Sequence, residues 1–259
     1  MKNFIIYKNT KIHFTSKGKG RVVVLLHGFL EDISMWKDII PVLSKRYRII
    51  AIDLLGHGKT DCIGYVHTME DHAKMVRVVL QHLRLRKYFL IGHSMGGYIA
   101  LAYAKMYPKT IKGLCLQNST FYTDDDELKQ VRLRANKMAQ SNYKILVQMS
   151  FTNLFSKKSI PLFKKELKEA LQIALKTQLQ GYIASQEGMR IREDFTQFFA
   201  NASFKKSIII GNKDTVVKGD KLLEFTKKHQ IKSYLFSNGH MSHIENKDEL
   251  IVALQEFLR

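Results

Sequence analysis

Short apolar runs alternate with helix-like segments from residue 22 onward, and this alternation constrains the fold more than any other feature of the chain. The runs are rich in branched residues, are bounded by turns and occupy residues 22–26, 48–52, 88–91, 111–116, 207–210 and 231–236. Helical length and apolar spacing are found at residues 67–83, 95–107, 219–229 and 247–258. Alternation of this kind predicts a mostly parallel sheet with helices on both faces.

Two further segments complete the predicted architecture. Residues 4–7 and 11–15, joined through Asn9, read as an antiparallel hairpin at one edge, which brings the expected sheet to eight strands. The strand–helix rhythm stops near Phe121, and only helical periodicity follows until it resumes. We therefore expect an α/β core made of residues 1–120 and 189–259, with a helical insertion at residues 121–188.

Composition narrows the class of protein. The chain has 259 residues, of which 42 are Lys or Arg and 23 are Asp or Glu, so its formal net charge is +19. The lysines are scattered and lack interleaved aromatic residues, so we expect no nucleic-acid partner, while the charge favours anionic small molecules. Cys62 and Cys115 are isolated and exclude a disulfide framework or a zinc ribbon. No signal peptide or membrane span is visible, and we expect a cytoplasmic protein without a membrane partner.

The segment Gly92-His93-Ser94-Met95-Gly96 follows a predicted strand and opens a predicted helix. A serine on such a sharp turn is raised above the sheet edge, where a base can reach its hydroxyl. The alternative is a tight turn in which Ser94 only caps the helix. The strand–turn–helix context favours a nucleophile.

A serine nucleophile requires a general base and a carboxylate that orients the base. Asp214 follows a predicted strand and is the preferred acid, while Asp220 is a weaker alternative inside the next helix. His240 follows the last predicted strand and is the preferred base. His243 is the alternative, and a packing or hydrogen-bonding role suits it better.

The order Ser94, Asp214, His240, together with His27-Gly28-Phe29 and the segment at residues 53–58, resembles the α/β-hydrolase superfamily over nearly the whole chain. The resemblance implies the α/β-hydrolase fold with this triad. It also implies that the backbone N–H groups of Phe29 and Met95 form an oxyanion hole. Neither a metal nor an organic cofactor is implied.

The helical insertion resembles the cap of many members of the superfamily. Met149 and Phe155 of the insertion, with Leu30 and His93, are candidate substrate-pocket residues, although such apolar side chains also pack a cap's own core. Arg190 and Arg192, where the insertion closes, are expected to bind a substrate carboxylate or, more simply, to pair with Glu193 and Asp194 as solvated charges.

Three functions remain open. Ser94 argues against the haloalkane dehalogenase and epoxide hydrolase branches, which resemble this fold but use Asp at that position. The first reading is a carboxylesterase-like hydrolase of a small ester or thioester, acting as a monomer or homodimer. The second is a carbon–carbon lyase or hydrolase of the menaquinone-pathway SHCHC synthase type, although Tyr98 stands where that branch commonly has Arg. The third is a small-molecule receptor that uses the same pocket.

Overall fold

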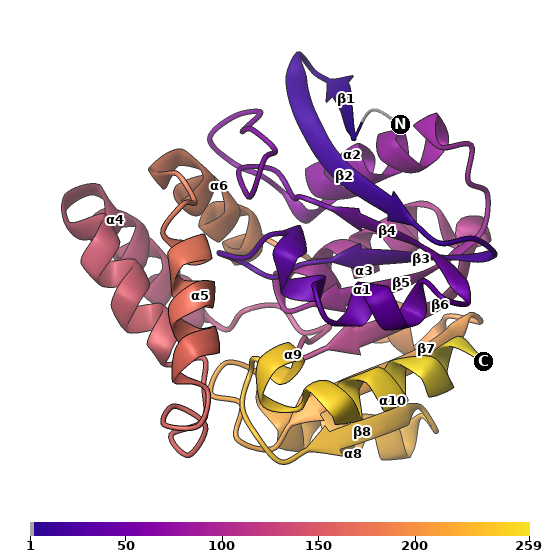
Figure 1. Cartoon of the computed structure of the whole chain (residues 1–259). Coiled ribbons are helices and arrows are strands. Elements are labelled where there is room, and N and C mark those ends of the chain that lie inside the picture. The colour runs from indigo at the N-terminus through magenta and orange to yellow at the C-terminus, as the bar shows by residue number, and fades with distance from the viewer. Residues whose placement is uncertain (1–2) are drawn as a thin grey trace.

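An eight-stranded sheet forms the centre of the protein, as Figure 1 shows. The computed structural model describes residues 3–259. The strand order is β1-β2-β4-β3-β5-β6-β7-β8, with antiparallel pairing of β2 to β1 and to β4 and parallel pairing elsewhere. The predicted mostly parallel sheet is confirmed. Its strands are β1 (Phe4–Tyr7), β2 (Thr10–Lys17), β3 (Arg21–Leu26), β4 (Tyr47–Ile52), β5 (Tyr88–His93), β6 (Ile111–Gln117), β7 (Lys205–Gly211) and β8 (Lys232–Phe236).

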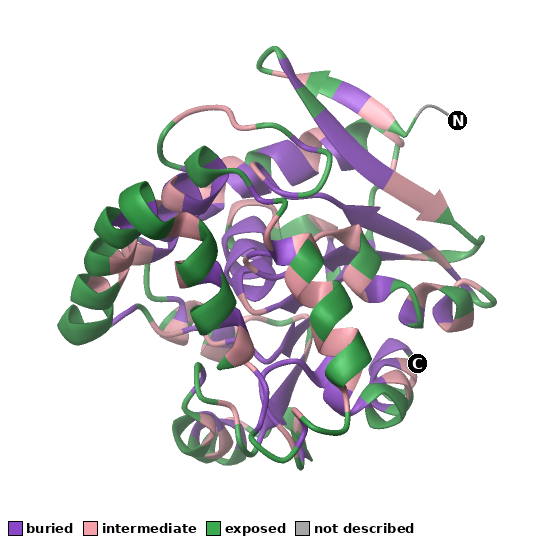
Figure 2. Ribbon diagram, turned by 60° about the vertical axis from the view of Figure 1, so that its left-hand side comes forward, coloured by how far each residue is buried: buried purple, intermediate pink, exposed green. Residues whose placement is uncertain are grey.

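Helices cover both faces of the sheet. One face packs against α1 (Ile39–Leu43) and α10 (Lys247–Leu258), and the other packs against α2 (Met69–His82), α3 (Met95–Met106) and α8 (Gly219–Lys228). Figure 2 shows the strands largely buried while the outer helix faces are exposed. Short elements complete the core at η1 (Ile33–Trp36), η2 (Pro108–Thr110) and α9 (Ser242–Glu245).

The two-sided burial explains why β3 is apolar from Val22 to Leu26, after the exposed Arg21 at its start. Val23 and Leu25 belong to the cluster under α1 and α10, whereas Val24 and Leu26 belong to the cluster under α2 and α3. Successive side chains of a strand point to opposite faces, so a strand covered on both sides has no polar position. The apolar runs of the sequence therefore mark the central strands reliably.

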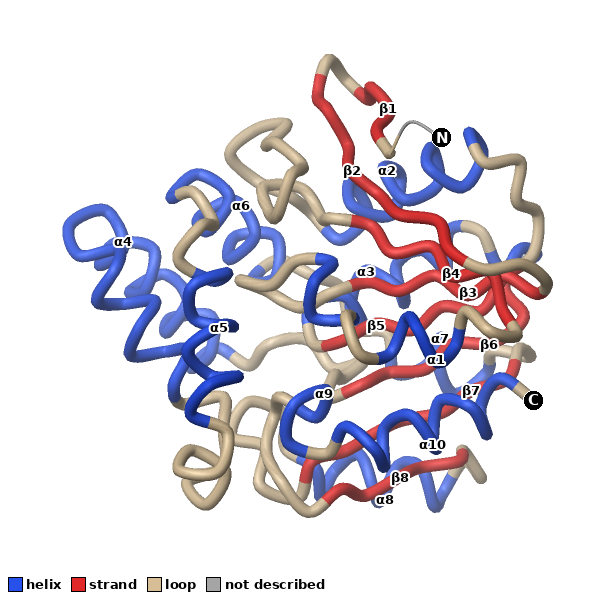
Figure 3. The backbone as a smooth tube through the Cα atoms, in the orientation of Figure 1, coloured by secondary structure: helices blue, strands red, loops and turns tan. Residues whose placement is uncertain are grey.

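Between β6 and β7 the described residues form helices joined by loops and no strand, as Figure 3 shows. They are α4 (Asp126–Thr152), α5 (Lys164–Ala174), α6 (Leu179–Arg190) and α7 (Thr196–Asn201). The longest, α4, bends at Asn142, whose φ of −136° and ψ of 45° are not helical. Neither α4 nor any other helix within residues 3–259 is long and apolar enough to cross a membrane.

Helices α4, α5 and α6 form a group at one side of the sheet, which we call the cap (Figure 1). Phe151, Phe155 and Tyr182 of the cap share a buried apolar cluster with Leu30, from the loop after β3, and with Met241, from the loop after β8. The cap is therefore seated on loops that follow strands of the core.

A cluster of one buried carboxylate and two guanidinium groups links the start of α4 to the segment just after the C-terminal end of α6. The Asp124 carboxylate, 2% exposed, contacts the guanidinium groups of Arg132 and Arg192 at 2.5 and 2.7 Å. The expectation that Arg192 pairs with Glu193 or Asp194 is wrong. Arg192 is buried, where an unpaired charge is costly, and within residues 3–259 its carboxylate partner is the buried Asp124.

Candidate active site

Ser94 lies at the turn between β5 and α3 in a strained conformation, with φ of 49° and ψ of −117°. A Cβ atom on Gly96 would lie 2.3 Å from the Leu26 carbonyl oxygen, so the tight turn requires glycine there. The Ser94 N–H donates to the Gln117 carbonyl at 3.0 Å, and its carbonyl accepts from the Ser119 hydroxyl at 2.7 Å. These contacts hold a strained serine at the amino end of α3.

Asp214 and His240 lie on the loops that follow β7 and β8. His240 Nδ1 donates to Asp214 Oδ2 at 2.8 Å, and Asp214 Oδ1 accepts the N–H groups of Val216 and Val217. Burial raises the pKa of Asp214, but the charge and hydrogen bond of His240 and the two amides outweigh it, so the pKa lies below its usual value. Asp220, the other candidate acid, lies in the first turn of α8.

The two atoms that would react, the Ser94 hydroxyl oxygen Oγ and the outer ring nitrogen Nε2 of His240, have no hydrogen-bond partner among the described residues. His93, directly before Ser94, stacks its ring 5.0 Å from that of His240 and contacts the His240 carbonyl oxygen. Ser94 and His240 therefore lie on two segments that the hydrogen bond of His93 joins. A hydrogen bond between a nucleophile and its base is often long or absent without substrate and forms fully only when substrate binds.

In the loop after β3, the carbonyl and the N–H of Gly28 are held by hydrogen bonds, whereas the N–H of Phe29 is not. His27 Nδ1 donates to the Gly28 carbonyl and His27 Nε2 accepts from the Leu54 N–H, while the Gly28 N–H donates to Glu31 Oε2 at 2.7 Å. The N–H groups of Phe29 and Met95 donate to no acceptor among the described residues. Hydrogen bonds therefore hold the loop in place, while one N–H in the loop, that of Phe29, and one at the start of α3, that of Met95, remain available to a ligand.

Sequence reasoning missed a buried cluster of Glu31, His93 and His243 beside these loops. Glu31 Oε2 lies 2.7 Å from His93 Nδ1, and Glu31 Oε1 lies 3.7 Å from His243 Nε2. Burial raises the pKa of Glu31, but His93 chiefly, with His243 and His27, lowers it to about 2. Burial lowers the pKa of His243 to about 4, so that imidazole is neutral above this pH. The available signal was Glu31 directly after the apolar pair Phe29-Leu30 in the loop after β3.

The candidate pocket residues lie in different surroundings. His93, 1% exposed, is enclosed in the cluster just described, and Leu30 and Phe155 are buried where the cap meets the core. Met149 is 65% exposed on α4, on the side of that helix that also exposes Ile145, so it lies outside the buried contact between cap and core.

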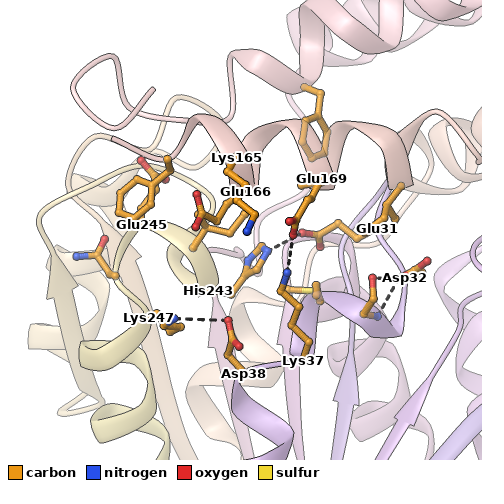
Figure 4. A pocket seen from close by; sticks show the side chains of 18 of the residues that line it. Glu31, Asp32, Lys37, Asp38, Lys165, Glu166, Glu169, His243, Glu245 and Lys247 are labelled. Atoms are coloured by element: carbon orange, nitrogen blue, oxygen red, sulfur yellow. Dashed lines mark hydrogen bonds and ion pairs between the residues drawn. The ribbon is translucent and has the colours of Figure 1, made fainter. Parts of the chain in front are cut away.

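A cavity of about 660 Å³ opens between α5, the segment from Leu30 to Asp38 and the start of α10 (Figure 4). Carboxylates outnumber lysines along its wall, which contrasts with the basic chain as a whole. Lys37 pairs with Glu169 at 2.7 Å across it. Glu31 and His243 reach the cavity, but the side chains of Ser94, Asp214 and His240 do not line it.

Comparisons with known proteins agree with this architecture. The family model of the alpha/beta hydrolase fold matches residues 21–247. A thermophilic esterase from Thermogutta terrifontis superposes with a TM-score of 0.90 at 27% identity, covering 96% of this chain and 93% of the esterase. The enol-lactonase from Burkholderia xenovorans LB400, at 20% identity and a TM-score of 0.91 over 98% of this chain and 99% of its own, shows the same fold.

Curated relatives match over shorter segments. An uncharacterized hydrolase, YugF, from Bacillus subtilis is 34% identical over 111 residues, which are 42% of this chain and 40% of the relative. Haloalkane dehalogenase 2 from Mycobacterium tuberculosis is 29% identical over 152 residues, 58% of this chain and 52% of its own. The chain thus spans about half or less of these relatives' length. The match to the family model nonetheless covers most of the sequence, and the protein belongs to the alpha/beta hydrolase fold family.

Proposed function

We propose that the protein is a serine hydrolase that cleaves a small carboxylic ester or thioester through an acyl-enzyme on Ser94. The observation that carries the proposal is a strained serine on one loop beside a buried carboxylate–imidazole pair, Asp214 and His240, whose outer nitrogen is free. The structural similarity to an esterase at 27% identity supports esters as the substrate class.

In the first half of the proposed reaction, His240 Nε2 accepts the proton of the Ser94 hydroxyl as its oxygen attacks the substrate carbonyl. Asp214 keeps the proton on Nδ1 and stabilises the imidazolium that forms. The free N–H groups of Phe29 and Met95 donate to the oxyanion. The imidazolium then protonates the leaving alcohol or thiol, which departs and leaves Ser94 acylated.

The second half uses the same groups. His240 takes a proton from water, whose oxygen attacks the acyl carbonyl, and the oxyanion is again held by the two N–H groups. Collapse of this intermediate breaks the bond to Ser94, which recovers its proton from His240. A carboxylic acid leaves and the enzyme is restored.

The carbon–carbon lyase alternative is less well supported. That reading needs a cation free to bind a substrate carboxylate near Tyr98, and Arg192 does lie over the Tyr98 ring at 4.1 Å. However, Arg192 already contacts Asp124 and donates to the carbonyls of Met189 and Tyr122. Its guanidinium is therefore committed within the protein, whereas the groups needed for acyl transfer are free.

The test is a panel of p-nitrophenyl esters and matching thioesters graded by acyl length, assayed with the wild type and Ser94→Ala. We expect kcat to fall by about 10⁶-fold in Ser94→Ala, since the nucleophile is lost. Intact mass spectrometry after treatment with a fluorophosphonate should show one adduct, located on Ser94. Ser141→Ala, which removes an exposed hydroxyl on α4, should behave as the wild type.

Two outcomes would reject the proposal. Unchanged turnover in Ser94→Ala would remove the nucleophile assignment. A tightly bound small molecule with no acylation of Ser94 would favour the receptor reading.

Inclusion of an anionic ester, assayed at low and high salt, also tests whether the charge of +19 steers anionic substrates, in which case kcat/KM falls as salt rises.

A further inference from the structure

The ring of His93 lies between two acceptors. His93 Nδ1 is 2.7 Å from the Glu31 carboxylate oxygen Oε2, and His93 Nε2 is 3.0 Å from the carbonyl oxygen of His240. A neutral imidazole has one N–H, so it satisfies only one of these acceptors, whereas an imidazolium satisfies both. With Glu31 ionised, both hydrogen bonds can form only if His93 is doubly protonated.

His27, in the neighbouring loop, shows the contrast. Its Nδ1 faces an acceptor, the Gly28 carbonyl, but its Nε2 faces a donor, the Leu54 N–H. A neutral ring fits this arrangement without a second proton. The double-acceptor environment is thus a particular property of His93 rather than of the loops in general.

Glu31 supplies the counter-charge. Its side chain is 5% exposed, and Oε2 accepts from the Gly28 N–H at 2.7 Å as well as from His93. Burial lowers the pKa of His93, but the charge and hydrogen bond of Glu31 and the His240 carbonyl outweigh it, so the pKa lies above its usual value. A buried imidazolium with a buried carboxylate is a compensated arrangement.

This pair joins the segments that the acyl-transfer reaction needs. Gly28 precedes Phe29, whose N–H is free, His93 precedes Ser94, and the His240 carbonyl belongs to the general base itself. We propose that Glu31 and His93 form a permanent buried ion pair that positions the oxyanion loop, the nucleophile and the loop of His240 relative to one another. The kinetic part of this inference rests on the proposed function, whereas the protonation of His93 does not.

A metal site is the competing interpretation. One ligand atom from each of Glu31, His93 and His243 lies within 4.8 Å of the others, and Glu31 Oε1 and His243 Nδ1 are buried without a hydrogen-bond partner. However, a metal ion bound there would have to replace the proton that His93 Nδ1 shares with Glu31. The two interpretations therefore predict opposite protonation states of the same nitrogen.

The first experiment measures that protonation directly. In ¹⁵N-histidine-labelled wild-type protein, the His93 signals are identified by their loss in His93→Gln. We expect both ring nitrogens to carry protons at about pH 8, well above the ordinary histidine pKa of about 6.5. A neutral ring at that pH, or a stoichiometric metal in the purified protein by elemental analysis, overturns the proposal. Neither readout depends on whether the protein hydrolyses esters.

The second experiment removes the charge of Glu31 without its shape. In Glu31→Gln, one amide oxygen still accepts from Gly28 and from one imidazole N–H, but His93 loses its counter-charge and becomes neutral. One of its two hydrogen bonds is then lost. We expect kcat on the best ester of the panel to fall about 100-fold, the cost of a small misplacement of reacting groups, with much less change in KM.

The pH profile separates positioning from general damage. The titratable groups facing His93 are Glu31, His240 and His243, with Asp214 behind His240. Since Glu31 raises the pKa of His93, the wild type should keep the imidazolium to a higher pH than Glu31→Gln, and the variant should lose activity at a lower pH. Glu169→Gln removes a carboxylate from the cavity wall without touching His93 and should match the wild type.

An unchanged kcat and an unchanged alkaline limb in Glu31→Gln would refute the positioning role. If Glu31→Gln fails to fold, the protonation of His93 in the wild type still decides the inference. If no ester is hydrolysed by any variant, the proposed function fails while the nuclear magnetic resonance result stands on its own.

Discussion

Two buried carboxylate–imidazole pairs lie side by side in this protein and differ in what the second imidazole nitrogen faces. Asp214 contacts His240 at 2.8 Å, and Glu31 contacts His93 at 2.7 Å. Asp214 also accepts two backbone N–H groups and Glu31 accepts one. The outer nitrogen of His240 takes part in no hydrogen bond among the described residues, whereas that of His93 faces the His240 carbonyl.

The comparison teaches that a carboxylate beside an imidazole does not by itself define a catalytic pair. In the proposed mechanism, His240 must gain and lose a proton in every cycle, so its second nitrogen has to remain without a fixed acceptor. His93 is enclosed by acceptors and cannot lose a proton without losing a hydrogen bond. The same two residue types therefore serve as a base in one region and as a fixed cation in the other.

Removal of the charge at Asp214 is expected to give the largest effect within this comparison. Asp214→Asn keeps the size of the side chain but no longer stabilises the imidazolium or selects the correct tautomer of His240, so kcat should fall about 10⁴-fold. Steady-state kinetics on the best ester measures the loss. Asp220→Asn is the matched control in the first turn of α8. If Asp220→Asn gave the large loss instead, the assignment of the acid would be wrong.

Much of the α/β core and the position of the elbow follow from the sequence because their signals are local. A fully buried parallel strand is a short apolar run, and β5 carries that run directly before the glycine-flanked Ser94. Asp214 follows such a run in β7, and His240 follows β8, an edge strand of which only Phe236 is buried. Parallel strands end at one edge of a sheet, so their convergence there could be expected before any coordinates were known.

The buried ion pairs could not be predicted in this way, because their partners are far apart along the chain. Glu31 and His93 are separated by 62 residues, and Arg192 pairs with Asp124 rather than with its sequence neighbours. Local patterns favour the neighbours, whereas burial selects partners through the three-dimensional packing of the cap and core. The protonation state of His93 depends on two such distant contacts.

The second prediction concerns the free energy of unfolding that the ionised Glu31 carboxylate contributes, measured as the difference between the wild type and Glu31→Gln. A carboxyl whose pKa falls from 4.5 to about 2 on folding stabilises the native state by about 3 kcal/mol above pH 4.5, and this contribution is lost as the pH falls toward 2. Glu31→Gln should therefore have a lower free energy of unfolding at neutral pH, and the difference should shrink in acid. Urea unfolding at several pH values measures it.

The matched control for this measurement is Glu169→Gln. That carboxylate is 45% exposed and pairs with Lys37 at the cavity wall, so solvent screens the interaction. We expect little change in its free energy of unfolding at any pH. A difference between Glu31→Gln and the wild type that did not vary between neutral pH and acid would contradict the ionised state of Glu31.

A change at Gly28 should disturb the Glu31–His93 region while leaving both charges in place. A Cβ atom on Gly28 would lie 2.5 Å from Glu31 Oε2 and 2.8 Å from His93 Nδ1, so Gly28→Ala must displace the pair. We expect kcat to fall about 100-fold, because the oxyanion loop moves with it. Gly64→Ala adds the same methyl group where no atom lies within 4 Å and should behave as the wild type.

The outcome of Gly28→Ala also tests whether activity depends on the position of the Glu31–His93 pair. If the alanine variant retains full activity and both ring protons of His93, the close packing around Gly28 does not control the pair. If it loses activity while both ring protons remain, the position of the pair matters as well as its charge, because the methyl group displaces Glu31 and His93 without neutralising them.

The smallest effect is expected at His243, the third member of the buried cluster. Its imidazole is neutral above a pKa of about 4 and lies 3.7 Å from Glu31 Oε1, too far for a strong hydrogen bond. His243→Gln removes no charge and keeps an N–H donor, so kcat should stay within about twofold of the wild type, less than about 0.5 kcal/mol in the barrier. The alkaline limb of the pH profile should not move. A shift of that limb comparable to that in Glu31→Gln would mean that His243 shares the counter-charge of Glu31, and the pair would then have to be treated as a triad.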